Sequence, residues 1–121
     1  MIKSYTDIEQ SKKLAEILPL ESADMCWQYQ KDRWVGEPDY EEFPQFEHAT
    51  DKRDIPCWSL AALLNIIQET TPYKMEHFGD KKVQLTCVLG DKPWELIISD
   101  FDNEVDACYE MILKLHELKM L

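Results

Sequence analysis

The feature that most constrains the fold is the longest apolar run in the 121-residue chain, DIPCWSLAALLNII, residues 54–67. Its leucines, isoleucines and alanines leave almost no polar face, and a helix of that kind is buried on most sides. Asp54 is a plausible N-cap, and a proline is tolerated in the first turn, where its missing N–H has no partner to lose. We therefore expect a central core helix over residues 55–68, closed by residues 70–72.

Two more helices are predicted, one towards each end of the chain. In residues 6–18, Thr6 and Glu9 have the spacing of a capping box, in which each side chain satisfies the other residue's free backbone N–H. Residues 103–119 carry one apolar stripe at helical spacing, with Asp102 or Asn103 as the cap; the stripe consists of Val105, Cys108, Ile112, Leu115 and Leu118.

Strand patterns fill most of the remaining chain. Residues 24–30 alternate and suit a short strand, and residues 73–78 form another. Two alternating runs flank a turn at residues 90–93 and predict a hairpin. Consecutive strands joined by short turns indicate an antiparallel sheet with helices on one face. We expect one α+β domain over residues 1–121, with a small antiparallel sheet of about three to four strands packed against two or three helices.

Composition excludes several kinds of partner and site. Thirteen basic against 24 acidic side chains give a net charge of −11, which repels nucleic-acid phosphates and anionic lipids. We expect no direct nucleic-acid binding and no membrane span, and a basic protein partner fits best. The four cysteines form no CxxC pair, so no zinc site or other metal site is expected, and no cofactor. Free thiols and the lack of a signal peptide favour the cytoplasm.

Residues 31–53 have no periodicity and predict a long loop, unusual in so small a domain. Four aromatic residues of this loop, Trp34, Tyr40, Phe43 and Phe46, are spaced among Glu37, Asp39, Glu41, Glu42 and Glu47. Two interpretations stay open. The aromatic side chains either fold back over an open side of the core, or form a protein-binding surface on which acidic neighbours select a basic partner.

Cys57 is a candidate catalytic nucleophile. At a helix N-terminus its thiol would have a lowered pKa, and a Cys–Trp–Ser start to a buried helix resembles papain-like peptidases. That chemistry needs a histidine within hydrogen-bond reach, and His77 is the best candidate in the sequence. The usual glycine-rich segment before the cysteine is lacking, and a small buried core thiol is the simpler interpretation.

Three blocks of the sequence resemble a group of small uncharacterised proteins from gut Bacteroides and their relatives, often on phage-like or other mobile elements. The blocks are SYTDIEQSKKLAEILPLESADM, IPCWSLAALL and VDACYEMILKLHELKML. The resemblance implies a cytoplasmic bacterial protein and assigns no catalytic residue.

The sequence as a whole favours a non-enzymatic interaction protein, an accessory factor of a mobile element. One alternative is an acidic mimic that occupies the nucleic-acid site of another protein. The other is a small cysteine hydrolase that uses Cys57. An oligomer is compatible with each of these.

Overall fold

The computed structural model describes residues 3–79, 82–88 and 95–121, so the predicted turn at residues 90–93 lies outside the described residues. The fold is α+β, as predicted. Its elements, in chain order, are α1 (Ile8–Ala15), a short 3-10 helix η1 (Leu20–Ser22), β1 (Met25–Trp27), β2 (Ile55–Cys57), α2 (Leu60–Thr70), β3 (Tyr73–Phe78), β4 (Lys82–Val88), β5 (Glu95–Phe101) and α3 (Glu104–Glu117).

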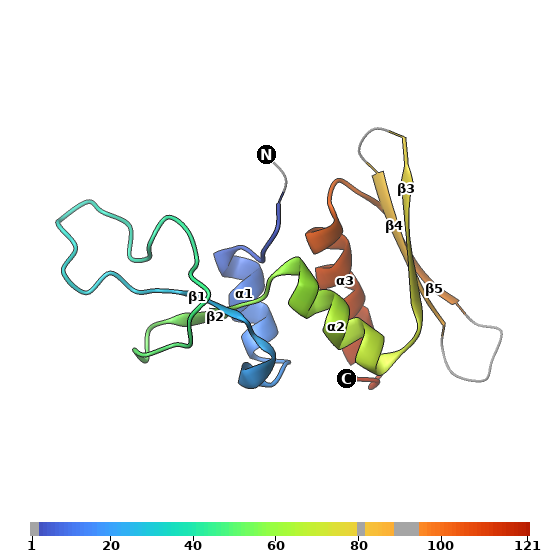
Figure 1. The fold of residues 1–121 in the computed structure, drawn as a ribbon, viewed down its shortest axis with the longest axis horizontal. Helices are drawn as coiled ribbons and strands as arrows, with labels where there is room; N and C mark the ends of the chain where they lie inside the picture. Colours follow the sequence, from blue (N-terminus) through green and yellow to red (C-terminus); the bar gives the residue numbers. More distant parts are fainter. Residues whose placement is uncertain (1–2, 80–81, 89–94) are drawn as a thin grey trace.

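The predicted hairpin is confirmed as part of a three-stranded antiparallel sheet in the order β3-β4-β5. In β4, Val83, Leu85 and Cys87 point into the core and alternate with more exposed residues, as the sequence pattern requires. Helices α2 and α3 lie on the inner face of this sheet (Figure 1). The larger core fills the space between them.

Helix α3 largely follows its predicted stripe. Val105, Cys108, Ile112 and Leu115 are fully buried, and Asn103 caps the helix by accepting a hydrogen bond from the Asp106 N–H at 2.8 Å. Leu118 departs from the prediction, because the helix ends at Glu117 and leaves the Leu118 side chain half exposed.

The start of the central helix was predicted wrongly. Residues 55–57 form strand β2, and α2 begins only at Leu60, with Ser59 as its N-cap. Strand β2 pairs antiparallel with β1, so the same run of sequence first extends one sheet and then turns into a helix. The chain therefore has a second, two-stranded sheet that local sequence patterns did not predict.

The predicted cap of α1 was also wrong. Asp7, not Thr6, is the N-cap, and its capping-box partner is Gln10, not Glu9. Asp7 Oδ1 accepts from the Gln10 N–H at 2.7 Å, and Gln10 Oε1 accepts from the Asp7 N–H at 3.1 Å. The helix ends at Ala15, three residues earlier than expected.

Thr6 is fully buried and joins two distant segments instead. Its N–H donates to the Trp58 carbonyl at 3.0 Å, and its hydroxyl oxygen accepts from the Trp58 N–H at 3.2 Å. The Leu60 N–H donates to the Ser4 carbonyl at 3.0 Å. Residues 4–6 thus run antiparallel to residues 58–60 at the point where β2 becomes α2.

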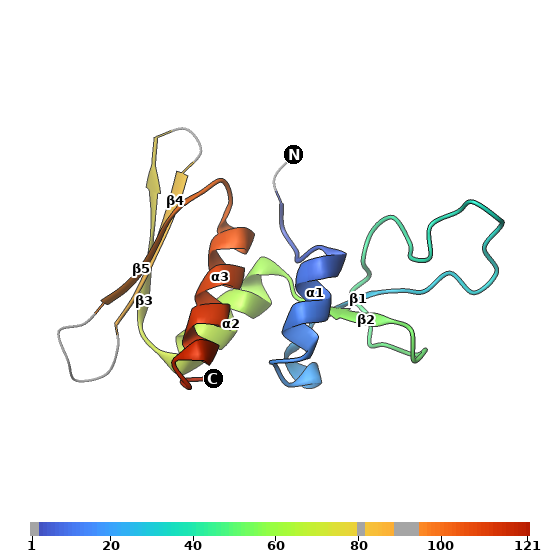
Figure 2. The same cartoon turned by 180° about the vertical axis from the view of Figure 1, so that it is seen from behind.

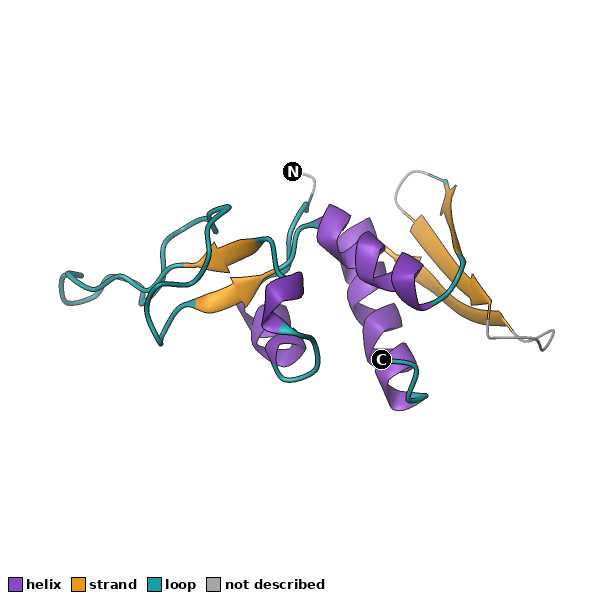
Figure 3. Ribbon diagram, turned by 60° about the horizontal axis from the view of Figure 1, so that its bottom comes forward, coloured by secondary structure: helices purple, strands orange, loops and turns teal. Residues whose placement is uncertain are grey.

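This junction lies between two hydrophobic cores. The smaller core is formed by β1, β2 and the start of α1, with Met25, Trp27, Ile55 and Cys57 buried in it. The larger core extends from the three-stranded sheet through α2 and α3 to the far end of α1. The two sheets consequently lie at opposite ends of an elongated molecule, with the helices between them (Figures 2 and 3). Within the described residues, no helix has the length and apolar character needed to cross a membrane.

Candidate functional site

The long loop, residues 31–53, is held by its backbone against strand β1 and against residues 28–30 that follow it. The Gln30 N–H donates to the Asp39 carbonyl at 2.8 Å, and the Glu41 N–H donates to the Gln28 carbonyl at 3.0 Å. Cys26 and Gln45 exchange backbone hydrogen bonds of 2.8 and 2.9 Å. The loop therefore continues the small sheet with isolated bridges and has a defined path, although its sequence has no period.

Asp54 fixes the return of this loop to β2. Its carboxylate accepts hydrogen bonds from the backbone N–H groups of Tyr29, Thr50 and Asp51 at 2.8–3.0 Å. Burial raises the pKa of the Asp54 carboxyl, but these three hydrogen bonds favour the charged form and together hold its pKa below its usual value. Asp54 is thus an anchor of the loop and not the helix cap that the sequence predicted.

The four aromatic residues of the loop divide between the two interpretations. Tyr40 folds back: its hydroxyl donates to the Arg53 carbonyl at 2.9 Å, and its ring meets the Tyr29 ring edge-on at 5.7 Å. Trp34, Phe43 and Phe46 stay exposed, at 78%, 53% and 73%. One aromatic side chain therefore covers the smaller core, and three lie on the surface.

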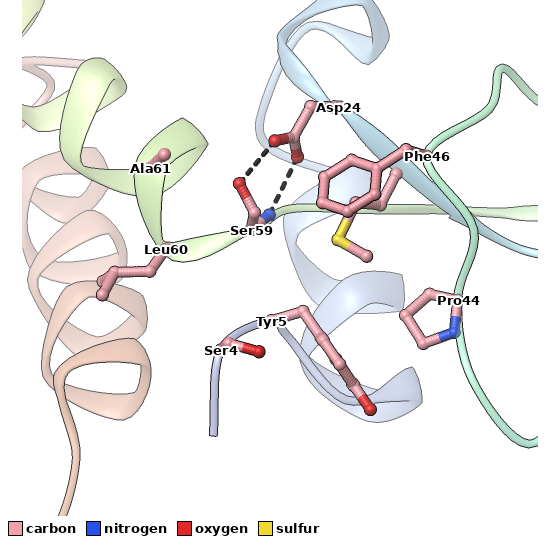
Figure 4. A pocket seen from close by; sticks show the side chains of 9 residues that line it. Ser4, Tyr5, Asp24, Pro44, Phe46, Ser59, Leu60 and Ala61 are labelled. Carbon is pink, nitrogen blue, oxygen red and sulfur yellow. Dashed lines mark hydrogen bonds between the residues drawn. The ribbon is translucent and has the colours of Figure 1, made fainter. Parts of the chain in front are cut away.

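Phe46 and Pro44 form one wall of a depression that we call the apolar groove (Figure 4). It has a volume of about 530 Å³, within the range of ligand-binding pockets. Its other walls come from the N-terminal segment, β1 and the first turn of α2, and its apolar lining consists of Tyr5, Met25, Pro44, Phe46, Leu60 and Ala61. Most of the polar lining is a single pair, Asp24 and Ser59.

Asp24 and Ser59 stabilise the start of α2. One Asp24 oxygen accepts from the Ser59 N–H at 2.9 Å, and the other accepts from the Ser59 hydroxyl (Figure 4). The Ser59 hydroxyl oxygen in turn accepts from the Ala62 N–H at 3.2 Å, as an N-cap does. Although a serine and a carboxylate meet in this groove, the pair is accounted for as a helix cap.

A second depression lies beside the apolar groove on the same face of the small sheet, since Met25 lines one and Trp27, two residues further along β1, lines the other; we call it the acidic groove. It has a volume of about 580 Å³. Its lining combines an apolar floor with carboxylates and one lysine, and consists of Ile8, Lys12, Trp27, Pro38, Asp39, Tyr40, Glu41 and Glu42. Tyr5 of the apolar groove contacts Trp27 of the acidic groove edge-on, with ring centroids 5.8 Å apart. The two grooves are therefore separated by one pair of aromatic rings.

The structure does not bring together the two residues predicted for catalysis. Cys57 is fully buried, and its thiol donates to the Thr6 carbonyl at 3.3 Å. Burial raises the pKa of the Cys57 thiol, opposed in part by hydrogen bonds from Thr6 and Ser11. His77 lies on β3, at the opposite end of the molecule, where its Nε2 is 2.7 Å from Glu104 Oε1. Cys57 is not at a helix N-terminus, so the dipole argument for a reactive thiolate no longer applies.

The other cysteines are also buried and unpaired. Burial raises the pKa of Cys26 and of Cys87 to about 11 and that of Cys108 to about 12. In the described part of the chain, no group of three or more histidine, cysteine, aspartate or glutamate side chains is arranged to hold a metal ion.

The chain matches no protein-family model, and the searches of curated proteins and of solved structures found no match either.

Sequence reasoning identified Phe46 as a candidate binding residue but missed the rest of the apolar groove. Met25, Leu60 and Tyr5 come from three separate segments and carry no shared local pattern. The bridge between Cys26 and Gln45 brings Phe46 beside them, and nothing in the loop sequence indicates that pairing.

Proposed function

We propose that the protein is a non-enzymatic interaction factor that binds a basic protein partner through the 31–53 loop and the apolar groove beside it. The observation that carries the proposal is the contrast within the loop. Its backbone is held by hydrogen bonds to β1 and to residues 28–30, while Trp34, Phe43 and Phe46 remain exposed. A surface that is already ordered loses little conformational entropy when a partner binds.

The aromatic side chains and the charge support the same kind of partner. Large aromatic side chains are enriched among the residues that contribute most to binding at protein interfaces. The net charge of −11 and the carboxylates on the same loop attract a basic partner during association and repel an acidic one. A role as accessory factor of a bacterial mobile element, in the cytoplasm, is part of this proposal and rests on the sequence resemblance alone.

Site-specific cross-linking in the native host tests the proposal. A photo-reactive amino acid is placed at position 34 or 46 in the loop, or at the control position 97, where Ile97 is exposed on the outer face of the three-stranded sheet. We expect an adduct with one basic protein from the loop positions and none from position 97. Serine in place of Phe43 should weaken the adduct formed at position 46.

Two results would contradict the proposal. One is the same adducts from the loop and from position 97, and the other is no adduct from the loop. An adduct that survives replacement of the loop aromatics but disappears at moderate salt would instead favour the acidic mimic, because screening removes contacts between exposed charges.

A further inference from the structure

The floor of the acidic groove is apolar and fixed in place. Trp27 is almost fully buried, and its indole N–H donates to the Thr6 carbonyl at 3.2 Å. Tyr40 beside it is held by the hydrogen bond from its hydroxyl to the Arg53 carbonyl. Both rings are therefore ordered before any ligand arrives, and each presents part of its surface to the groove.

The rim of the acidic groove carries more negative than positive charge. Asp39 is paired with Arg33 at 3.0 Å, and Lys12, the one cation in the lining, is 3.9 Å from Glu9. Among the ion pairs of the described residues, none involves Glu41 or Glu42. The Glu41 backbone N–H is bonded to Gln28, which keeps this part of the rim close to β1.

We propose that the acidic groove binds an arginine side chain of the partner segment whose apolar residue occupies the apolar groove. The inference rests on the proposed function for its partner and names the chemistry of that partner. A guanidinium stacks on aromatic rings and forms paired hydrogen bonds with carboxylates, so it suits a groove with an aromatic floor and a carboxylate rim. Its aliphatic stem can lie on Trp27 and Pro38 while the charge stays at the rim.

One observation favours arginine over other ligands, and a second favours a single partner segment that enters both grooves. The chain already contains the same arrangement a short distance away, where the Arg53 guanidinium lies 3.9 Å from the centroid of the Tyr29 ring. The contact between Tyr5 and Trp27 makes the two grooves neighbours, so one extended segment can enter both. The partner segment is thus expected to carry an apolar residue followed or preceded by an arginine.

A nuclear magnetic resonance titration of the full chain tests the inference. The probe is Nα-acetyl-arginine N-methylamide, and the neutral citrulline analogue of the same shape is its control. The Trp27 indole N–H and the backbone N–H groups of Glu41 and Glu42 report on the groove. We expect saturable shifts of these signals with the arginine probe only, and weaker binding at higher salt.

Charge variants supply the matched comparison. Glu41→Gln with Glu42→Gln removes two negative charges from the groove, and Glu69→Gln with Glu117→Gln removes two exposed charges elsewhere. We expect the first pair to weaken arginine binding about tenfold, since the loss of each exposed ion pair weakens binding about threefold. The second pair should change it less than about twofold.

Equal shifts with citrulline, equal effects of the two double variants, or no saturable shift at the Trp27 indole would each overturn the inference. Failure of the proposed function gives a different pattern. In that case the cross-links from positions 34 and 46 are absent while the arginine titration still saturates. If arginine binding fails but the cross-links form, the proposed function stands and only the arginine assignment falls.

Discussion

Replacing Thr6 with valine should destabilise the protein through a single lost hydroxyl. The Thr6 side chain is fully buried, and its hydroxyl oxygen accepts from the Trp58 N–H at 3.2 Å and lies 2.7 Å from the Ser11 hydroxyl. Valine is nearly isosteric with threonine and lacks only the hydroxyl, so Thr6→Val isolates the loss of these hydrogen bonds.

The expected magnitude follows from what the valine leaves unpaired. Among the described residues, no other group accepts from the Trp58 N–H, and an unsatisfied buried donor costs about 1–3 kcal/mol. The Ser11 hydroxyl loses its hydrogen bond to Thr6 and keeps only a long contact of 3.5 Å to the Thr6 carbonyl. This second loss lowers the free energy of unfolding by about 1 kcal/mol more. We therefore expect Thr6→Val to lower the free energy of unfolding by about 2–4 kcal/mol, a large share of the 5–15 kcal/mol of an ordinary domain.

Urea denaturation followed by tryptophan fluorescence measures this change, with Thr6→Ser as the control. Serine keeps the hydroxyl and lacks one methyl group, so Thr6→Ser should lower the free energy of unfolding by about 1 kcal/mol. A free energy of unfolding for Thr6→Val within about 0.5 kcal/mol of the wild-type value, or an equal loss of stability in the two variants, would contradict this expectation.

Three further predictions concern the loop and the buried thiol. The folded-state pKa of Asp54 is lowered, so its stabilising effect is complete above about pH 4, the unfolded-state value, and is lost as the pH falls through the folded-state pKa. We expect Asp54→Asn to lower stability by about 1–2 kcal/mol at pH 7, and the gap to the wild type to narrow in acid unfolding; a constant gap would contradict this. Tyr40→Phe should cost about 1 kcal/mol in urea denaturation, because it removes the hydrogen bond to the Arg53 carbonyl, whereas Phe46→Ser should leave stability within about 0.5 kcal/mol. Iodoacetamide at neutral pH should label Cys57 far more slowly than a free thiol by mass spectrometry, and labelling should become fast only in denaturant; fast labelling of the native protein would reinstate a reactive thiol.

The parts of the fold that the sequence predicted correctly are those in which one local pattern decides the structure. The alternation of Val83, Leu85 and Cys87 and the stripe through Ile112 and Leu115 each reflect burial of one face against a single core. Such periodicity is imposed residue by residue along one element. It can therefore be recognised without knowing where the rest of the chain lies.

The start of α2 could not be predicted in this way, because pairing with a distant segment decides it. Residues 55–57 are as apolar as the helix that follows, and only their pairing with β1 makes them a strand. Ser59 did offer a local signal, since serine immediately before an apolar run is a good N-cap. Asp54 carries the same signal five residues earlier, but its carboxylate binds loop N–H groups instead.

The cap of α1 shows the same competition at shorter range. Thr6 with Glu9 and Asp7 with Gln10 both have capping-box spacing, and the sequence does not rank them. Burial decides between them, because Thr6 is needed beside Trp58 and so cannot cap the helix. In the loop, likewise, no pattern indicated that Tyr40 would fold back while Phe46 stayed exposed.

The junction at residues 57–59 has a consequence for how this chain can change over evolutionary time. Cys57 belongs to the smaller core, Trp58 to the larger core, and Ser59 caps α2. Deleting or inserting one residue here would move each side chain into its neighbour's place, so the length of this segment is fixed. The 31–53 loop carries no such restriction at its exposed tip. The part of the proposed binding surface around Trp34 therefore lies where the chain can lengthen, shorten or change its side chains while both cores stay intact, whereas the apolar groove, lined in part by Ser59, is tied to the fixed junction.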